Sequence, residues 1–250
     1  MANEFWLNDR QWSAIEPLLP HNQPGARRVD DRRVISGIVH VLKVGCRWED
    51  CPAIYGPSTT IYNRFNRWSR RGLWQRLFEA LVKTDGTDLQ MIDSTTARVH
   101  RSAAGGKGGP RPEAIGRSRG GRTTKVHAVA DRLGRLIAFT VTPGQFGDAP
   151  LAAALLAPLT EARLCIADAA YDSDALRRFL LDRGTLPVIP NNPTRKHFHP
   201  FNKRSYKQRN LIERMFCRLK DWRRIATRYD KLAANFAAAI AIASIVIWWA

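Results

Sequence analysis

The sequence has only four cysteines, and no spacing that pairs them. Cys46 and Cys51 have four residues between them, while Cys165 and Cys217 are isolated. This spacing matches neither a zinc site nor a disulfide framework, so we expect reduced thiols in a cytoplasmic protein. The first twelve residues, MANEFWLNDRQW, lack a basic start followed by an apolar run, so we expect no secretion signal.

Long apolar runs are also scarce, and the clearest is FAAAIAIASIVIWWA at residues 236–250. With the four residues before it, the run approaches the roughly 20 residues that span a bilayer. Asn235 and Ser244 interrupt it, and much of its apolar content is alanine. Length and composition therefore favour a buried core helix over a membrane anchor.

Acidic residues are the minority charge. The 250 residues include 22 Asp and Glu against 40 Lys and Arg, a formal net charge of +18. A chain this basic is expected to bind a polyanion, with nucleic acid the first candidate. Because 44% of the residues are hydrophobic and eight are tryptophans, the chain is not a disordered one.

The first 85 residues predict a compact helical module. Asn8, then Asp30 or Asp31, and then Ser58 are the expected caps of its first three helices. Apolar residues repeat at helical spacing in four segments: residues 9–19, 31–44, 58–71 and 73–82.

The third of these helices carries a polar face of one kind. Arg64, Arg67 and Arg71 lie opposite its apolar stripe, with Asn63 and Asn66 beside them. Such a face suits a helix-turn-helix-like module that docks in the major groove of DNA. An ordinary solvated face is the alternative, because arginine-rich faces are weakly diagnostic. Given the net charge, we favour DNA contact and predict a DNA-binding domain at residues 1–85.

Residues 86–250 predict a mixed α/β sheet, because β-rich runs first follow one another and then alternate with helical patterns. Strands are expected at residues 89–93, 123–131, 135–143, 163–168 and 186–190, and helices at 148–159 and 173–183. Between the first two strands, residues 100–122 are rich in Gly and Arg. We expect there a mobile basic loop that lies along a phosphate backbone, or else a disordered insert.

Two of the apolar runs end on an aspartate, MID at Asp93 and CIAD at Asp168. A carboxylate at the C-terminal end of a buried strand lies at the rim of the sheet, where α/β sheets bind ligands. If the two strands are neighbours, the carboxylates converge. The alternative for each is an aspartate that caps the following turn.

A third acid stands among basic residues in YKQRNLIERMFCRLK, residues 206–220. At about 100° per residue on one helix, Glu213 shares a narrow face with Tyr206, Arg209 and Lys220. An ordinary ion pair between Arg209 and Glu213 explains part of this spacing. Three converging carboxylates would instead form an oxygen-only site for two Mg²⁺ or Mn²⁺ ions, which suits two-metal phosphoryl transfer with the basic residues on the phosphates.

These residues resemble the signature of bacterial insertion-sequence transposases with a DDE triad, which reads Tyr, two residues, Arg, three residues, Glu, six residues, Lys. Tyr206, Arg209, Glu213 and Lys220 fit it without a gap. The stretches DSTTARVH and ADAAYDSDALR around the two aspartates are similar to the insertion-sequence-five family, in its smaller-transposase branch.

The resemblance implies a ribonuclease-H-like fold for residues 86–250, with Asp93, Asp168 and Glu213 as catalytic metal ligands. It also implies N-terminal helices that bind the terminal inverted repeats of the element, and an oligomer assembled on double-stranded DNA. The leading hypothesis is a Mg²⁺-dependent DNA transposase that cleaves these ends and joins the freed 3′ hydroxyl to target DNA.

Two alternatives stay open. One is a metal-dependent nuclease without strand transfer, and the other is a catalytically silent DNA-binding regulator. The second acid also has neighbours, Asp172 and Asp174, but Asp168 ends the apolar run and occupies the family position. We expect action on nucleoid DNA in the bacterial cytoplasm and no membrane partner.

Overall fold

The structure is a computed structural model that describes residues 4–20, 30–82, 88–104 and 114–250. Its internal contacts form two compact units. The first unit comprises Met1–Val82, Arg98–Glu113 and Leu219–Ala250, and the second comprises Lys83–Ala97 and Ala114–Arg218. The last 32 residues therefore belong with the N-terminal helices, which differs from the predicted boundary after residue 85.

The first unit is helical, and the four predicted N-terminal helices are confirmed. Asn8 forms a capping box with Gln11, and the Asp30 side chain accepts a hydrogen bond from the Arg33 N–H, so Asp30 is the second cap. Ser58 is not a cap, because the third helix begins at it and has no side-chain cap. The helices are α1 (Asp9–Ile15), α2 (Asp31–Val44), α3 (Ser58–Arg70), α4 (Leu73–Leu81), α5 (Arg101–Ala104), α10 (Arg223–Ala226) and α11 (Ala233–Ser244).

The apolar C-terminal helix α11 forms the core of this unit, as the sequence favoured. It packs against α2, α3 and α4, and its side chains Phe236, Ile240 and Ile242 are buried. A helix that is apolar on every side is expected where neighbours cover every side. Among the described residues, no helix is long and apolar enough to cross a membrane.

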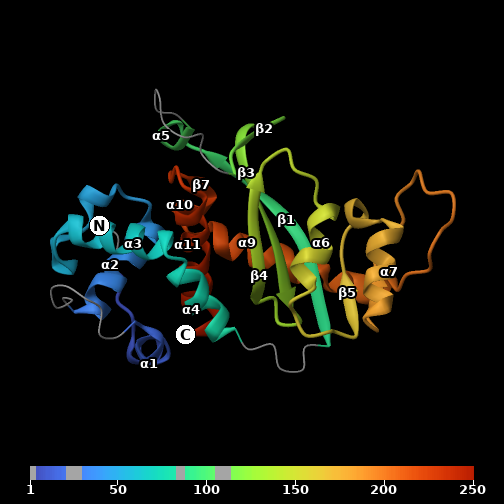
Figure 1. Cartoon of the computed structure of the whole chain (residues 1–250), viewed down its shortest axis with the longest axis horizontal. Coiled ribbons are helices and arrows are strands. Elements are labelled where there is room, and N and C mark those ends of the chain that lie inside the picture. The colour runs from blue at the N-terminus through green and yellow to red at the C-terminus, as the bar shows by residue number, and fades with distance from the viewer. Residues whose placement is uncertain (1–3, 21–29, 83–87, 105–113) are drawn as a thin grey trace. The chain divides into compact units, whose positions relative to one another are not determined.

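The second unit is built on a mixed sheet with helices on it (Figure 1). The strands run in the order β2-β3-β1-β5-β6, and β4 pairs with β3. In Figure 1, α6 (Ala149–Leu156) lies in front of the strands and α9 (Asn210–Lys220) passes behind them. The strands are β1 (Leu89–Val99), β2 (Gly116–Ser118), β3 (Gly121–Asp131), β4 (Leu136–Pro143), β5 (Leu164–Ile166) and β6 (Leu186–Val188).

The predicted hairpin is the antiparallel pair β3 and β4, and β1, β5 and β6 run parallel to one another. Every residue from Leu89 to Asp93 is buried, because β1 has β3 on one side and β5 on the other. Helix α7 (Asp174–Asp182), capped by Ser173, connects β5 to β6 as a crossover. The mixed α/β architecture predicted from the sequence is confirmed.

The predicted basic loop at residues 100–122 is in part regular structure. It contains a short helix, α5 (Arg101–Ala104), the strand β2, and the start of β3. Strand pairing of β2 with β3 through a tight turn overrides the high glycine content of this segment. Residues 105–113 of the predicted loop lie outside the described residues.

Candidate active site

Asp93 lies on β1, and Asp168 lies just after β5, the parallel strand beside it. Met91 of β1 pairs with Ile166 of β5, and each acid follows two residues later. Asp168 comes after the end of β5 as expected, and its side chain accepts a hydrogen bond from the Ala170 N–H. Asp93 does not end its strand, because β1 continues for six more residues to Val99. The neighbouring strands bring the two carboxylates together.

Glu213 reaches the same place from the first turn of α9. The predicted single helix through residues 206–220 is wrong in its first part. A short helix, α8 (Lys203–Tyr206), is capped by Asn202, and a 3-10 turn at Lys207–Arg209 joins it to α9. This tighter turn, and not one continuous α-helix, sets the positions of Tyr206 and Arg209 relative to Glu213.

The guanidinium of Arg209 faces all three acids. Its Nη2 lies 2.6 Å from Asp93 Oδ2 and 3.8 Å from Asp168 Oδ2, and its Nη1 donates to Glu213 Oε1. Its Nε is buried and has no hydrogen-bond partner among the described residues. The side chain is 20% exposed, so one cation stands between three carboxylates at the edge of solvent.

Burial differs among the three acids and sets their electrostatics. The side chain of Asp93 is 11% exposed, that of Asp168 34%, and that of Glu213 55%. Burial raises the pKa of Asp93 to about 6, against the opposing effects of Arg209 and of the hydrogen bond from the Ser94 N–H. The other two acids add to this rise. Burial opposes the charge on Arg209, but the surrounding carboxylates raise its pKa.

Tyr206 also belongs to this group. Burial raises the pKa of its hydroxyl, Arg209 lowers it, and the three acids raise it further. Its ring packs edge-on against Phe201, with ring centroids 5.8 Å apart. Lys220, the fourth signature residue, is half-buried and falls in the first unit. The second unit therefore brings together five of the predicted site residues: Asp93, Asp168, Tyr206, Arg209 and Glu213.

Comparison with known proteins places this chain in a family. A family model described as "Transposase DDE domain" matches residues 84–248, which is more than half of the chain. The chain belongs to the DDE transposase family. A second model, "Putative transposase of IS4/5 family", matches residues 7–78. The protein is thus a DNA transposase, and both its predicted class and its enzymatic nature are confirmed.

Curated relatives carry the same description. The putative transposase for insertion sequence element IS6501 of Brucella ovis is 42% identical over 127 residues, which is 50% of this chain and 98% of the relative. The putative transposase for insertion sequence element IS402 of Burkholderia cepacia is 32% identical over 154 residues, 57% of this chain and 69% of the relative.

Among solved structures, a piggyBac transposase synaptic complex with hairpin DNA matches with a TM-score of 0.50 and 13% identity. The match covers 94% of this chain and 69% of that one. With the strand order above, it confirms the ribonuclease-H-like fold of the transposase.

Family membership implies dependence on a divalent metal. Among the described residues, no three His, Cys, Asp or Glu side chains are placed to hold one ion together. Asp93, Asp168 and Glu213 nevertheless face a common cation, the Arg209 guanidinium, and all their donors are oxygens. Oxygen-only ligands of this kind suit hard divalent cations, so the donor set fits such a metal.

The two other aspartates after β5 have structural partners. Asp172 accepts from Arg177 and Arg195, and from the backbone N–H of Asn192. Asp174 pairs with Arg195 at 2.7 Å. These pairs give Asp172 and Asp174 structural partners, and Asp168 as the second acid stays a prediction.

A buried polar group beside the acids was not predicted from the sequence. Tyr171, three residues after Asp168, is buried, and its hydroxyl lies beside the Ser94 side chain, whose hydrogen bond lowers the pKa of the hydroxyl. Burial raises the pKa of this hydroxyl, and the nearby charges of Asp148, Asp93 and Asp168 raise it further. Its position in ADAAYDSDALR, close to Asp168, was the signal that could have identified it, but the sequence does not show which way its ring points.

In the first unit, one predicted DNA contact is wrong. Arg64 is only 3% exposed, because its guanidinium pairs with Asp31 of α2 and lies 4.8 Å from the Trp68 ring. The helix turns Arg64 inward, whereas its neighbours line an open hollow of about 410 Å³. The residues around that hollow are Asn63, Asn66, Arg67, Arg70 and Arg71, of which Arg70 was not predicted.

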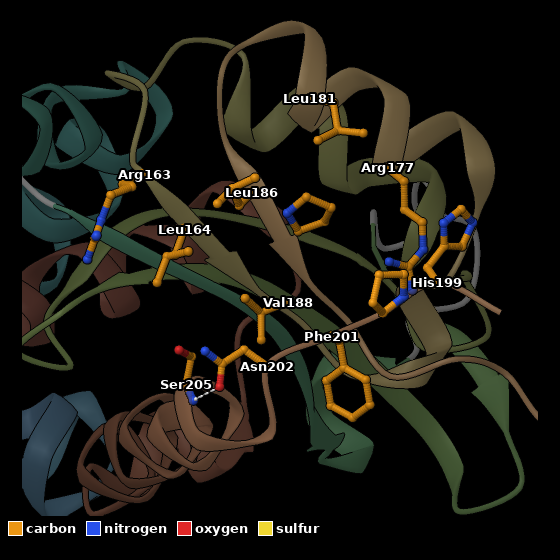
Figure 2. A pocket seen from close by; sticks show the side chains of 12 residues that line it. Arg163, Leu164, Arg177, Leu181, Leu186, Val188, His199, Phe201, Asn202 and Ser205 are labelled. Atoms are coloured by element: carbon orange, nitrogen blue, oxygen red, sulfur yellow. Dashed lines mark hydrogen bonds between the residues drawn. The ribbon is translucent and has the colours of Figure 1, made fainter.

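A larger cavity of about 560 Å³ adjoins the edge strand β6 (Figure 2). Figure 2 shows Leu181 on α7 and Leu186 on β6 at its wall, with Phe201 on the opposite side. None of the three acids is among the described residues that line it. The larger cavity is therefore separate from the acids, although Phe201 connects it to Tyr206.

Proposed function

We propose that Asp93, Asp168 and Glu213 hold two Mg²⁺ or Mn²⁺ ions that serve DNA cleavage and strand transfer. The observation that supports this assignment is their shared position around one cation, Arg209. When bound, two such ions activate the attacking oxygen and stabilise the leaving oxygen of a phosphodiester. No protein nucleophile is required.

The chain's own residues then position the DNA. Asp93 is fixed by a buried central strand, which gives the site a rigid wall. Arg209 and Tyr206 lie beside the acids, where a guanidinium and a hydroxyl can hold the phosphates that flank the scissile bond. Lys220 is proposed as a further phosphate contact from the end of α9.

We propose that the outer face of α3 binds the terminal inverted repeats of the insertion sequence. Asn63, Arg67 and Arg71 line the same hollow, together with Arg70, in a chain of net charge +18. Arginine and asparagine are the side chains that read guanine and adenine edges in a major groove. Because transposition joins two ends, a dimer or larger assembly on double-stranded DNA is part of this proposal, and nucleoid DNA in the bacterial cytoplasm is its place of action.

The test uses the full chain and a DNA fragment that carries one element end. Asp93→Asn, Asp168→Asn and Glu213→Gln are each expected to abolish cleavage while binding of the end persists. Glu161→Gln, at an exposed acid of the same unit, is the matched control and keeps activity. Cleavage that survives any of the three changes would remove that residue from the site.

Strand transfer needs its own measurement. With pre-cut ends, a target plasmid and Mg²⁺, the transposase is expected to give joined products, and a chelator is expected to stop the reaction. A nuclease would give no joined product. A silent DNA-binding protein would give neither product and would bind the ends equally well without Mg²⁺.

A further inference from the structure

Arg209 lies between the three acids that we propose as metal ligands. Its two terminal nitrogens contact different acids: Nη1 donates to Glu213, and Nη2 lies between Asp93 and Asp168. The acids are therefore oriented toward a guanidinium, and the described residues include no set of three that can bind one ion in this arrangement.

The two cations exclude each other on distance. A Mg²⁺ ion binds its oxygens at about 2.0–2.1 Å. Asp93 Oδ2 already accepts a hydrogen bond from Arg209 Nη2 at 2.6 Å. A divalent ion bound between the same oxygens would lie within contact distance of a positive guanidinium, and the two like charges would repel each other.

The charge of the three acids explains why a cation between them is useful while metal is absent. Three carboxylates carry three negative charges, and bare carboxylates this close repel one another. One guanidinium neutralises a third of that charge and links the helix α9 to β1 and β5 through its fork. Divalent ions neutralise the cluster more completely, so they have the advantage once they are present at sufficient concentration.

The position of Arg209 on the chain allows it to leave. It lies at the end of the 3-10 turn between α8 and α9, and short 3-10 stretches often mark hinges. Its Nε makes no hydrogen bond to the described residues, so its terminal nitrogens carry the polar contacts that retain it. Among the described residues, the ion pairs that its release breaks are those with the three acids.

We propose that Arg209 is a cation placeholder, which holds Asp93, Asp168 and Glu213 together before metal binds and which must release them when metal enters. The proposal rests on the assignment of these acids as metal ligands. We call the contacts of Arg209 with the three acids the Arg209 bridge. Metal and this bridge compete for the acids, so only the molecules in which the bridge is open can bind metal. The apparent metal affinity falls in proportion to that open fraction. The released guanidinium is then available to a DNA phosphate.

Metal affinity is the direct test. Mn²⁺ is titrated into the metal-free full chain without DNA, and free Mn²⁺ is followed by electron paramagnetic resonance. Arg209→Gln is expected to bind Mn²⁺ about tenfold more tightly than the wild type, a coupling of ordinary size. Arg214→Gln, an equal charge change at an exposed position of α9, is expected to bind as the wild type does.

A second readout separates the bridge from a general charge effect. In chelator, Arg209→Gln is expected to unfold at a lower temperature than Arg214→Gln, because its acids have lost their shared partner. Saturating Mn²⁺ is expected to raise the unfolding temperature of Arg209→Gln by more than it raises that of the wild type. Equal Mn²⁺ affinities of the wild type and Arg209→Gln, or equal tightening in both arginine variants, would overturn the placeholder.

Asp93→Asn distinguishes failure of this inference from failure of the metal site. If Asp93→Asn loses Mn²⁺ binding while Arg209→Gln binds like the wild type, the metal site stands and the placeholder is wrong. If Asp93→Asn binds Mn²⁺ as the wild type does, the assignment of the ligands is wrong, and the competition is wrong with it.

Discussion

Asp172 and Arg195 form an ion pair that ties the segment after β6 to the end of the 3-10 turn after β5. Arg195 Nε lies 2.9 Å from Asp172 Oδ2, and the same carboxylate receives Arg177 Nε at 2.7 Å. The carboxylate is fully buried. Burial opposes its charge, but the Asn192 N–H and the two guanidinium groups together lower the pKa of Asp172. This acid stabilises the fold four residues away from a proposed metal ligand.

Removing that carboxylate is expected to destabilise the transposase. Asp172→Ala leaves two largely buried guanidinium groups without their partner, which costs about 3–5 kcal/mol in the free energy of unfolding. Asp174→Ala, at a side chain that is 72% exposed, is expected to cost at most about 1 kcal/mol. Urea denaturation compares the two variants, and equal losses would contradict the structural role of Asp172.

Substitution of Arg64 is expected to lower stability, and substitution of Arg67 is expected to weaken DNA binding, although the two residues lie three positions apart on α3. Arg64→Ala removes a buried ion pair with Asp31 and is expected to cost about 3–5 kcal/mol of unfolding free energy. Arg67→Ala is expected to leave stability within about 0.5 kcal/mol. It should weaken binding of the element end and reduce the salt slope of binding by about 1 if Arg67 contacts a phosphate.

Gel-shift titrations over a range of salt concentrations, paired with denaturation curves, measure both effects. A loss of end binding in Arg64→Ala at full stability would contradict the inward position of its side chain. Unchanged end binding in Arg67→Ala would remove that residue from the proposed DNA surface.

His127 is expected to make stability depend on pH. It lies on β3 with its Nδ1 3.5 Å from Asp148 Oδ1, and burial lowers its pKa, although Asp148 opposes this effect. Its folded pKa is below that of the unfolded chain, so the neutral ring is favoured on folding. Stability is therefore full above pH 6.5 and falls as pH drops below 6.5 toward the folded pKa, because the unfolded chain binds the proton first.

Denaturation at pH 7.5 and at successive steps down to pH 5 measures this slope. His127→Gln is expected to reduce it, and His197→Gln, at an exposed histidine, is expected to leave it unchanged. The buried His40, whose pKa is also lowered by burial, accounts for part of the slope that remains. A slope unaffected by His127→Gln would contradict the prediction.

Gly134 is expected to be required where the turn between β3 and β4 approaches α9. Its φ is +70°, and a Cβ would lie 3.2 Å from the backbone oxygen of Leu211, two residues before Glu213. Gly134→Ala is expected to cost more than the roughly 1–2 kcal/mol of the left-handed backbone alone. It is also expected to weaken Mn²⁺ binding, because the start of α9 must shift.

Gly184→Ala is the matched control for this change. Gly184 has a φ of +72°, and among the described residues no atom lies within 4 Å of its added Cβ. It is expected to show the backbone cost alone, with Mn²⁺ binding unchanged. Equal effects of the two alanines on metal binding would show that the approach to Leu211 does not matter.

Local patterns in the sequence determined several elements of this transposase. The Asn8 cap, a second cap at Asp30 or Asp31, the β3 and β4 hairpin and the helix that begins near Ser173 were predicted, because capping and periodicity depend on residues a few positions apart. The spacing of Tyr206, Arg209 and Glu213 likewise identified the residues that now form one group. All these features depend on residues that lie close together in the sequence.

Contacts between distant segments decided the remainder. The sequence placed Asp93 at the end of a strand, but pairing with neighbouring strands carries β1 onward to Val99. It gave Arg64 an outer face, but Asp31 on another helix draws that side chain inward. It paired Arg209 with Glu213, but only the folded sheet added Asp93 and Asp168 to the same guanidinium. Burial and ion pairing depend on which segments contact one another in the folded chain, and the periodicity of the sequence does not specify those contacts.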